Sequence, residues 1–361
     1  LGNLTTTQIG GLTTSQVKAL STADFGALHD TQIDAMSASQ LGQISTTNFN
    51  TLDQTAIHAL TNTQLAGLST SQFASVNSTT LGNFTTTQVD ALTASQLGAL
   101  NATNFSALGV TAIGALNASQ IKGVTTTQMA GITTAALGAF SSTQVSDLSA
   151  SQLNALSSTN VGLLNATTQI NGLTASQVAG LNATAFSGLT TTQLGNLTTT
   201  QIGGLTTSQV KALSTADFGA LHDTQIDALS ASQLGALSST NVGNLDQTGL
   251  TGLNNTQLRG FSASQMASLS LTQVGQLIPT QFGVLTASQI GGLSTTVIQN
   301  MTTTQIDALQ VSQISGLAAS QIPYISTTDI LSLTTTQANA FTVAQTGAMN
   351  ATQLNAYVSA T

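Results

Sequence analysis

The sequence lacks cysteine, tryptophan and glutamate, and only 4% of its 361 residues are charged. An ordinary soluble domain is roughly 25% charged. Without cysteine the chain can form no disulfide, no thiol nucleophile and no Cys-based metal site. The hydrophilic surface must therefore consist mainly of Ser, Thr, Asn and Gln, whose side chains bind water without carrying charge.

Basic residues are also scarce, and the formal net charge is -8. The four cations, Lys18, Lys122, Lys211 and Arg259, are too scattered to form the basic patch that nucleic acid requires. No apolar run approaches the ~20 residues that cross a bilayer. We therefore expect no nucleic-acid partner and no membrane span. No segment resembles a signal peptide, so we expect a processed product or a piece of a longer protein.

The chain is built from one repeat of eight residues, an octad, in which position 1 is Leu4, Leu12, Leu20 and so on. The consensus is Leu, then Ser/Thr/Asn/Asp, any residue, Ser/Thr, Gln, Ile/Leu/Val/Phe, any residue, and Ala/Gly. The phase slips once between residues 164 and 173, near Thr168, and residues 1–35 recur unchanged at 194–228. We expect a single continuous octad-repeat array over residues 1–361.

Each octad carries the signals of a short capped helix. Position 2 favours helix N-cap residues, and Gln three residues later completes a capping box. The apolar residues at positions 1 and 6 form a hydrophobic staple, as in the run from Leu12 to Val17. Glycine at position 7 or 8 suits a helix end, and Pro279 at position 3 suits the first helical residue. The octad therefore predicts one helix of about one and a half turns.

The sequence favours an all-α solenoid, or superhelix, of these very short helices, with a β-solenoid as the alternative. One continuous helix is excluded because eight residues leave a drift of about 80° per repeat. Thr at positions 2 and 4 suits an exposed strand, but positions 1 and 6 have opposite parity along a strand. We expect positions 1, 6 and 8 to form a core between stacked repeats. The Gln at position 5 either caps the helix or also forms a stacked amide ladder.

Candidate ligand residues are isolated in the sequence. His29 and His222 occupy position 2 and His58 occupies position 7, without a second ligand at metal-binding spacing. A calcium site needs six to eight oxygens, usually from several neighbouring carboxylates. The carboxylates at position 7 are many octads apart: Asp34, Asp90, Asp227 and Asp307. We therefore predict no metal site.

No catalytic set is visible either. A serine nucleophile needs an adjacent base and an orienting group, and the chain has three His and no Glu. Asp24 and Asp217 replace Gln at position 5, which a capping box tolerates. We predict no catalytic residue, no cofactor-binding residue and no cofactor, and we expect that the protein is not an enzyme.

The run L-T-T-S-Q-V-K-A-L, from Leu12 to Leu20, resembles octads of very large bacterial adhesin-like or haemagglutinin-like surface proteins. The resemblance covers the entire chain and implies export, an extracellular or cell-surface location, and a role in attachment or matrix formation. The octad is also similar to the start of the DNA-reading repeats of plant-pathogen effectors. The longer repeat, the base-reading loop and the basic charge of those proteins are missing here, so we reject DNA binding.

These observations predict a structural repeat protein that self-assembles into an extracellular filament, fibre or sheath. Its partner would be itself, with the cell surface or extracellular matrix as a further partner. The alternative is a stalk or spacer region of a giant bacterial adhesin. A third interpretation is ice binding through rows of Thr on a β-solenoid.

Overall fold

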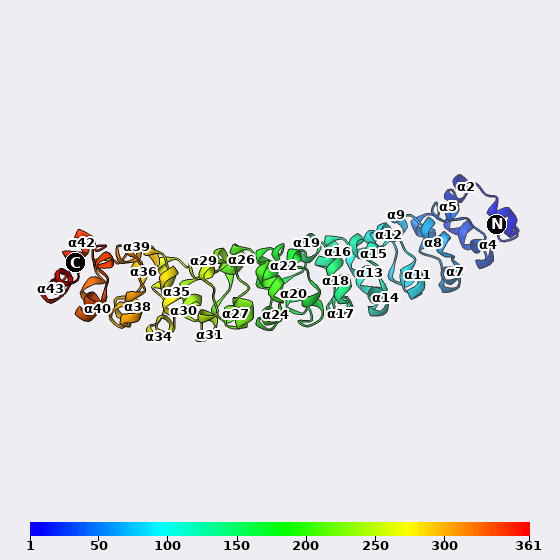
Figure 1. The fold of residues 1–361 in the computed structure, drawn as a ribbon. Helices are drawn as coiled ribbons and strands as arrows, with labels where there is room; N and C mark the ends of the chain where they lie inside the picture. Colours follow the sequence, from blue (N-terminus) through cyan, green and yellow to red (C-terminus); the bar gives the residue numbers. More distant parts are fainter. The chain divides into compact units, whose positions relative to one another are not determined.

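The computed structural model describes residues 1–361 and contains short helices but no strand. The predicted all-α repeat solenoid is confirmed, and the β-solenoid alternative is wrong. The chain divides into two compact units, Leu1–Asn196 and Leu197–Thr361. Figure 1 draws the first unit from blue to green and the second from green to red. The single continuous array over residues 1–361 stays a prediction.

The first unit contains one helix of four to six residues per octad. These are α1 (Thr6–Gly10), α2 (Thr14–Lys18), α3 (Thr22–Gly26), α4 (Asp30–Asp34), α5 (Ala38–Leu41), α6 (Thr46–Phe49), α7 (Gln54–Ala59), α8 (Asn62–Gly67), α9 (Thr70–Ala74), α10 (Ser78–Gly82), α11 (Thr86–Asp90), α12 (Ala94–Ala99), α13 (Ala102–Ala107), α14 (Val110–Ala115), α15 (Ala118–Gly123), α16 (Thr126–Ala130), α17 (Thr134–Gly138), α18 (Ser142–Asp147), α19 (Ala150–Asn154), α20 (Ser158–Gly162), α21 (Gln169–Gly172), α22 (Ala175–Ala179), α23 (Ala183–Ser187) and α24 (Thr191–Asn196).

The second unit follows the same plan and ends in a longer helix, α43. Its helices are α25 (Thr199–Gly203), α26 (Thr207–Ala212), α27 (Thr215–Gly219), α28 (Asp223–Ile226), α29 (Ala231–Ala236), α30 (Ser239–Gly243), α31 (Gln247–Thr251), α32 (Asn255–Leu258), α33 (Ala263–Met266), α34 (Leu271–Gly275), α35 (Pro279–Val284), α36 (Ala287–Gly292), α37 (Thr295–Gln299), α38 (Thr303–Asp307), α39 (Val311–Ile314), the 3-10 helix η1 (Ile322–Tyr324), α40 (Thr327–Ser332), α41 (Thr335–Ala338), α42 (Val343–Thr346) and α43 (Ala351–Ala360).

The capping box starts most of these helices, as predicted. At α2, the Thr13 hydroxyl oxygen accepts from the Gln16 backbone N–H at 3.2 Å. The Gln16 side-chain oxygen accepts in turn from the Thr13 backbone N–H at 2.8 Å. The backbone at Thr13 is extended, so the chain turns sharply into each helix. Pro279 is the first residue of α35, also as predicted. These caps satisfy N–H groups that the short helices leave without partners.

Glycines at positions 7 and 8 end several helices, as predicted, for example Gly42 after α5 and Gly11 after α1, but none of them has left-handed backbone. The only residue with positive φ is Gly109, at φ 85°. That glycine precedes α14 and occupies position 2, where a side-chain cap is absent. The helices end instead in residues with right-handed or extended backbone, such as Ala19 and Leu68. Most glycines therefore serve another purpose.

Small residues allow adjacent turns of the superhelix to approach closely. Helix α5 packs against α8, three octads further on, and a Cβ added to Gly67 of α8 would lie 2.5 Å from the Ala38 carbonyl oxygen and 2.6 Å from the Ala38 Cβ. The same contact recurs at Gly123 on Ala94, Gly260 on Ala231 and Gly316 on Ala287. Position 8 thus lies between turns rather than in the core.

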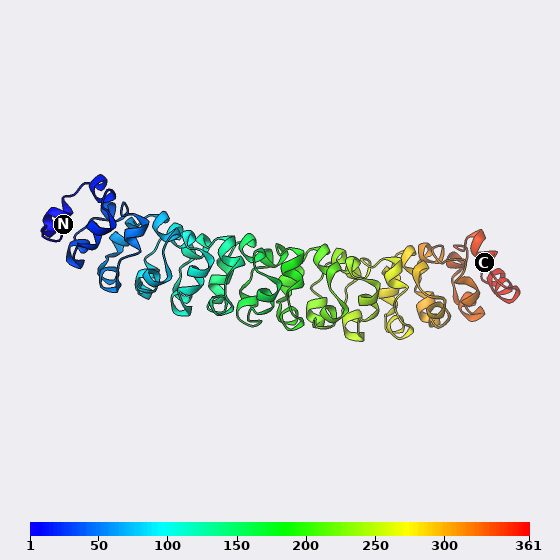
Figure 2. The same ribbon diagram turned by 180° about the vertical axis from the view of Figure 1, so that it is seen from behind.

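Within each unit the helices wind into a superhelix. Each helix packs mainly on the third helix along the chain, as α26 does on α29. Side-chain hydrogen bonds join residues 28 and 31 positions apart, and 28 residues are three and a half octads. One turn therefore takes about three and a half octads. Helices are visible from both sides of each unit (Figures 1 and 2).

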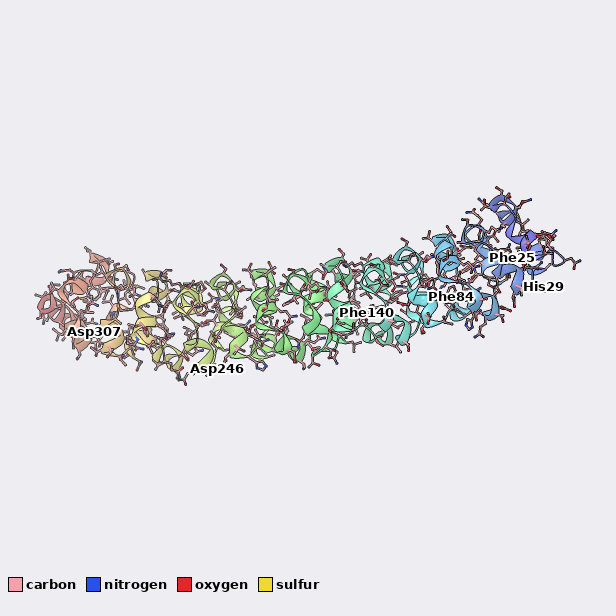
Figure 3. The ribbon with its side chains drawn as sticks, turned by 45° about the vertical axis from the view of Figure 1, so that its right-hand side comes forward. Phe25, His29, Phe84, Phe140, Asp246 and Asp307 are labelled. Atoms are coloured by element: carbon pink, nitrogen blue, oxygen red, sulfur yellow. The ribbon has the colours of Figure 1, made fainter.

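Positions 1 and 6 form the core, as predicted. Leu92 and Leu97 are 3% and 0% exposed, and Phe84 is likewise buried among apolar neighbours (Figure 3). The prediction that position 8 joins this core is wrong, because Ala19 and Ala27 are exposed. Position 5 is buried instead, as at Gln96. The interior of each unit therefore includes the polar side chain at position 5, whereas the Ala or Gly at position 8 lies outside the core.

The phase slip is absorbed at the start of α21. The Asn165 side-chain oxygen accepts from the backbone N–H groups of Thr167 and Thr168, which holds the additional residue in a wider turn. The side-chain oxygen of Gln169 still accepts from the Asn165 N–H, now four residues earlier rather than three. Contacts that span the insertion lengthen to 29 and 32 residues, as between Gln177 and the preceding turn. The insertion therefore stays local.

Substitution of Gly67 tests the close packing between turns. We expect Gly67→Ala to destabilise the first unit by about 1–3 kcal/mol, the usual cost of overpacking. Gly82→Ala is the matched control, because a Cβ there meets nothing within 4 Å. The control should be neutral or stabilising by up to about 1 kcal/mol, since alanine restricts the unfolded chain. Equal unfolding midpoints for the two variants would contradict this packing.

Candidate functional site

The three histidines lie on the surface and apart from other ligands. His29 and His222 precede α4 and α28, where their backbone N–H groups donate to the side-chain oxygens of Gln32 and Gln225. Neither imidazole caps its helix. His58 is exposed in α7. No group of three or more His, Cys, Asp or Glu residues could hold a metal ion.

The position-7 carboxylates are distributed over separate helices. Asp34 and Asp90 belong to α4 and α11 of the first unit, whereas Asp227 follows α28 and Asp307 ends α38 in the second. Asp307 is exposed and accepts from the Ser332 hydroxyl at 2.6 Å (Figure 3). The structure brings none of these four together.

Asp34 has an unfavourable environment for charge. One oxygen of its carboxyl is buried without a hydrogen-bond partner. Burial raises the pKa of Asp34 above its ordinary value, and the nearby Asp30 carboxylate raises it further. Burial and Asp223 raise the pKa of the equivalent Asp227 in the same way. Ionised Asp at these places therefore reduces stability.

Asp24 and Asp217 act as the capping residues that the sequence predicts. The Asp24 carboxylate accepts from the Ser21 hydroxyl at 2.7 Å and from the Ser21 backbone N–H at 3.3 Å. These two bonds, the hydroxyl bond first, lower the pKa of Asp24. Asp217 makes the same contacts with Ser214. Both carboxylates stabilise a helix start.

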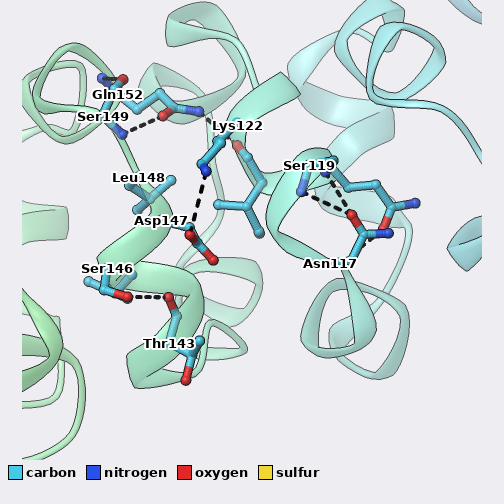
Figure 4. Close-up of polar contacts among 12 residues, drawn as sticks. Asn117, Ser119, Lys122, Thr143, Ser146, Asp147, Leu148, Ser149 and Gln152 are labelled. Carbon is cyan, nitrogen blue, oxygen red and sulfur yellow. Dashed lines mark hydrogen bonds and ion pairs between the residues drawn. The ribbon is translucent and has the colours of Figure 1, made fainter.

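The single ion pair joins adjacent turns of the first unit. The Lys122 Nζ lies 4.0 Å from an Asp147 oxygen, and the lysine side chain is 66% exposed (Figure 4). Exposed pairs of this kind contribute little to stability. Charge therefore plays a minor part in holding the turns together.

The group that recurs throughout is the glutamine at position 5, whose carboxamide we call the inter-turn amide. At Gln96, 2% exposed, the side-chain oxygen accepts from the Thr93 N–H at 2.8 Å. Its Nε2 donates to the carbonyl oxygens of Leu65 and Leu68, at 2.7 and 2.8 Å, on the preceding turn. The stacked amide ladder is therefore wrong, because the amide donates to backbone carbonyls rather than to another Gln.

This double role explains why glutamate is absent from position 5. Glutamate would complete the capping box as well as glutamine. A carboxylate has no N–H, however, and would face two carbonyl oxygens in a buried place. Asp329 is a buried carboxylate at this position, and it accepts from the Thr303 hydroxyl of the preceding turn at 2.9 Å and from the Ser326 hydroxyl. Hydroxyl donors replace the missing carbonyl contacts there.

The outer surface repeats with the octad. In the octad of α8, the exposed residues are Thr61, Asn62, Thr63 and Ala66, at positions 2, 3, 4 and 7. Because a turn takes about three and a half octads, equivalent residues of successive octads point in different directions around each unit. The surface is accordingly similar on all sides and rich in neutral hydroxyl and amide groups.

The inter-turn amide can be tested by removing only its donors. We expect Gln96→Glu to destabilise the first unit by roughly 3–5 kcal/mol at pH 7, the cost of an unpaired buried charge. Gln16→Glu is the matched control, because Gln16 is exposed and bonds only to Thr13. Chemical denaturation should show almost no change for the control. Similar losses in both variants would show that capping alone matters.

Asp34→Asn tests the unfavourable carboxylate. The pKa of Asp34 is higher in the folded protein than in the unfolded chain. The free energy of unfolding therefore decreases as pH rises from the unfolded pKa of about 3.9 through the folded pKa. We expect the variant to gain free energy of unfolding at pH 7, within about 0.5 kcal/mol because the residue is partly solvated. The gain should disappear below the unfolded pKa. A gain that is independent of pH would contradict the assignment, and Asp227→Asn provides a replicate.

Comparisons with known proteins identify a repeat protein and no more specific relative. A family model described as the ALTTAQ repeat matches residues 1–30, 185–215 and 210–247. No curated protein matches the chain. Among solved structures, the leucine-rich repeat-containing protein LegL7 from Legionella pneumophila is 14% identical, with 74% of this chain and 80% of that chain covered, at a TM-score of 0.13. That likeness carries no argument about the fold. No helix of the chain has both the length and the apolar character to cross a membrane.

Proposed function

We propose that this repeat protein is a structural protein that associates with copies of itself into an extracellular filament, fibre or sheath. The observation that carries the proposal is the repeated neutral surface of each unit. The same inter-turn contacts hold octad after octad, so equivalent hydroxyl and amide groups recur at regular intervals. A second copy meets the same surface at many positions along its length.

Low charge supports this proposal. A large net charge keeps proteins apart through long-range repulsion. Here 4 cations and 12 Asp are spread over 361 residues. Copies can therefore approach closely, and their Ser, Thr, Asn and Gln side chains can exchange hydrogen bonds with water for hydrogen bonds with each other.

Exposed apolar side chains add a second kind of contact in the second unit. Eight of the eleven large exposed hydrophobic residues lie between residues 271 and 358. Val343 is the most exposed of them, at 89%. Burial of such side chains between copies favours association. In this proposal the protein works outside the cell or at its surface, has no catalytic step, and can also attach to the cell surface or matrix.

A stalk or spacer region of a giant adhesin is the second candidate, and the contained phase slip favours it. Each inter-turn amide depends only on the residues about one turn before it, so additional octads leave distant contacts unchanged. The exact duplication of residues 1–35 at 194–228 fits a chain whose length can vary. Ice binding through rows of Thr would need a β-solenoid, and the chain has no strand.

The first test is cryo-electron microscopy of the protein from its native source, together with sedimentation of the purified chain. We expect ordered filaments with an axial repeat set by the octads. Isolated particles that stay monomeric at all concentrations would contradict assembly and favour the spacer.

Surface charge provides a designed test of the same proposal. Thr63, Thr87 and Thr127 are exposed at position 4. Aspartate near a helix start is compatible with the fold. We expect the triple Asp variant to keep its melting temperature but to lose assembly at low salt and recover it near 1 M salt, where the screening length is about 3 Å. A triple Asn variant is the neutral control. Unchanged assembly of the Asp variant would contradict lateral association through this surface.

A further inference from the structure

One inter-turn amide is replaced by a cavity. Ala56 occupies position 5 and is 1% exposed. The residues 28 and 31 positions earlier, Leu28 and Phe25, are the ones to which a glutamine at this position would donate. A cavity of about 200 Å³ lies there, with apolar walls that include Phe25, Leu28 and Ile33. Its volume is that of a small organic molecule rather than of a single water.

The polar atoms around this cavity are acceptors. Asp30 and Asp53 line it. The Leu28 carbonyl oxygen accepts no hydrogen bond, whereas the equivalent Leu68 oxygen accepts from Gln96. Thr51 also lines the cavity, but its hydroxyl already donates to the Asn48 carbonyl oxygen at 2.7 Å. One Asp53 oxygen already accepts from the Ala56 backbone N–H at 2.9 Å, and Asp53 is exposed to solvent. The cavity therefore offers the other Asp53 oxygen, the Asp30 carboxylate and a free carbonyl, with no available donor.

The same pair of carboxylates, beside an octad without the glutamine, occurs a second time, 193 residues later. Gly249 takes the place of Ala56, and Asp223 and Asp246 take the places of the two carboxylates. A Cβ at Gly249 would lie 3.3 Å from an Asp246 oxygen and 3.5 Å from an Asp223 oxygen. Both carboxylates thus converge on the place that a glutamine side chain occupies elsewhere. At Ala112, another octad without this glutamine, the equivalent residues are Thr86 and Gly109, which carry no charge.

We propose that these two places bind a small organic cation with N–H donors, either an alkylammonium or an amidinium group on a short aliphatic body. The N–H groups donate to the free Leu28 carbonyl and to Asp30 and Asp53, as the glutamine amide donates elsewhere. The positive charge pairs with two carboxylates, and the aliphatic part contacts the apolar walls. Charge-assisted hydrogen bonds of this type are about twice as strong as neutral ones. The inference does not depend on filament formation.

The test is a titration of the full-length chain with acetamidinium at low ionic strength, followed by the NMR signals of the Ala56 methyl and the Gly249 amide. We expect saturable shifts and two sites per chain. Acetamide has nearly the same shape without charge, and it should bind roughly tenfold more weakly or less. Tetramethylammonium has charge but no N–H and should not produce the shifts. Equal binding of acetamidinium and acetamide, or no saturation, would overturn the proposal.

Three variants separate the cavity from a general charge effect. Ala56→Gln places a native-like amide in the first site and should reduce the stoichiometry from two to one. Ala112→Gln is the matched control and should leave both sites intact. Asp30→Asn, which keeps the cavity, should weaken the first site by roughly tenfold. Unchanged binding in Ala56→Gln would overturn the assignment.

The source of the cation can be distinguished with two further probes. Free n-butylammonium and the side chain of N-acetyl-lysine amide carry the same group. Binding of the first alone would identify a free amine as the ligand. Binding of both would fit a lysine side chain of a partner. Binding of neither would contradict the alkylammonium ligand, and the acetamidinium titration alone would then decide whether an amidinium binds.

Discussion

The buried carboxamide at position 5 is the interaction on which the rest of the structure depends. Helices of four to six residues are far too short to be stable alone. One glutamine solves this by accepting from the N-cap of its own helix and donating to the backbone of the preceding turn, as Gln96 does. Local structure and superhelix are thereby coupled through a single group. Only a neutral amide offers an acceptor and two donors at this reach, which accounts for the absence of glutamate from position 5.

The small residues between turns are the counterpart of this amide. Its donors reach carbonyl oxygens of the preceding turn only because helices such as α5 and α8 approach until Ala38 and Gly67 touch. Larger residues at that contact would separate the turns and leave the carbonyls without donors in a buried place. Close packing and amide bonding therefore require each other. This mutual dependence explains why the octad varies freely at exposed positions and little at the others.

Local features of the fold could be predicted from the sequence, and features that depend on the turn length could not. The capping boxes, the apolar core at positions 1 and 6 and the place of Pro279 follow from signals within one octad. The octad period does not reveal how many octads complete a turn. The hydrogen bonds from Gln96 to Leu65 and Leu68 could therefore not be predicted. For the same reason, the sequence did not reveal that position 5 is buried and that position 8 lies outside the core. The cavity at Ala56 left a signal, because a missing glutamine coincides there with two Asp.

The neutrality of the outer surface has a different origin from the neutrality of the interior. The fold requires a neutral amide at position 5, but it places no such demand on positions 2, 3, 4 and 7. Lys122 and Asp307, both exposed at position 7, show that exposed positions accept charge without disturbing their octads. Ordinary soluble domains use such positions for charged residues, which oppose aggregation. A chain that leaves nearly all of them uncharged forgoes this protection along its length. Function must then account for the choice, and close contact between copies is a function that benefits from it.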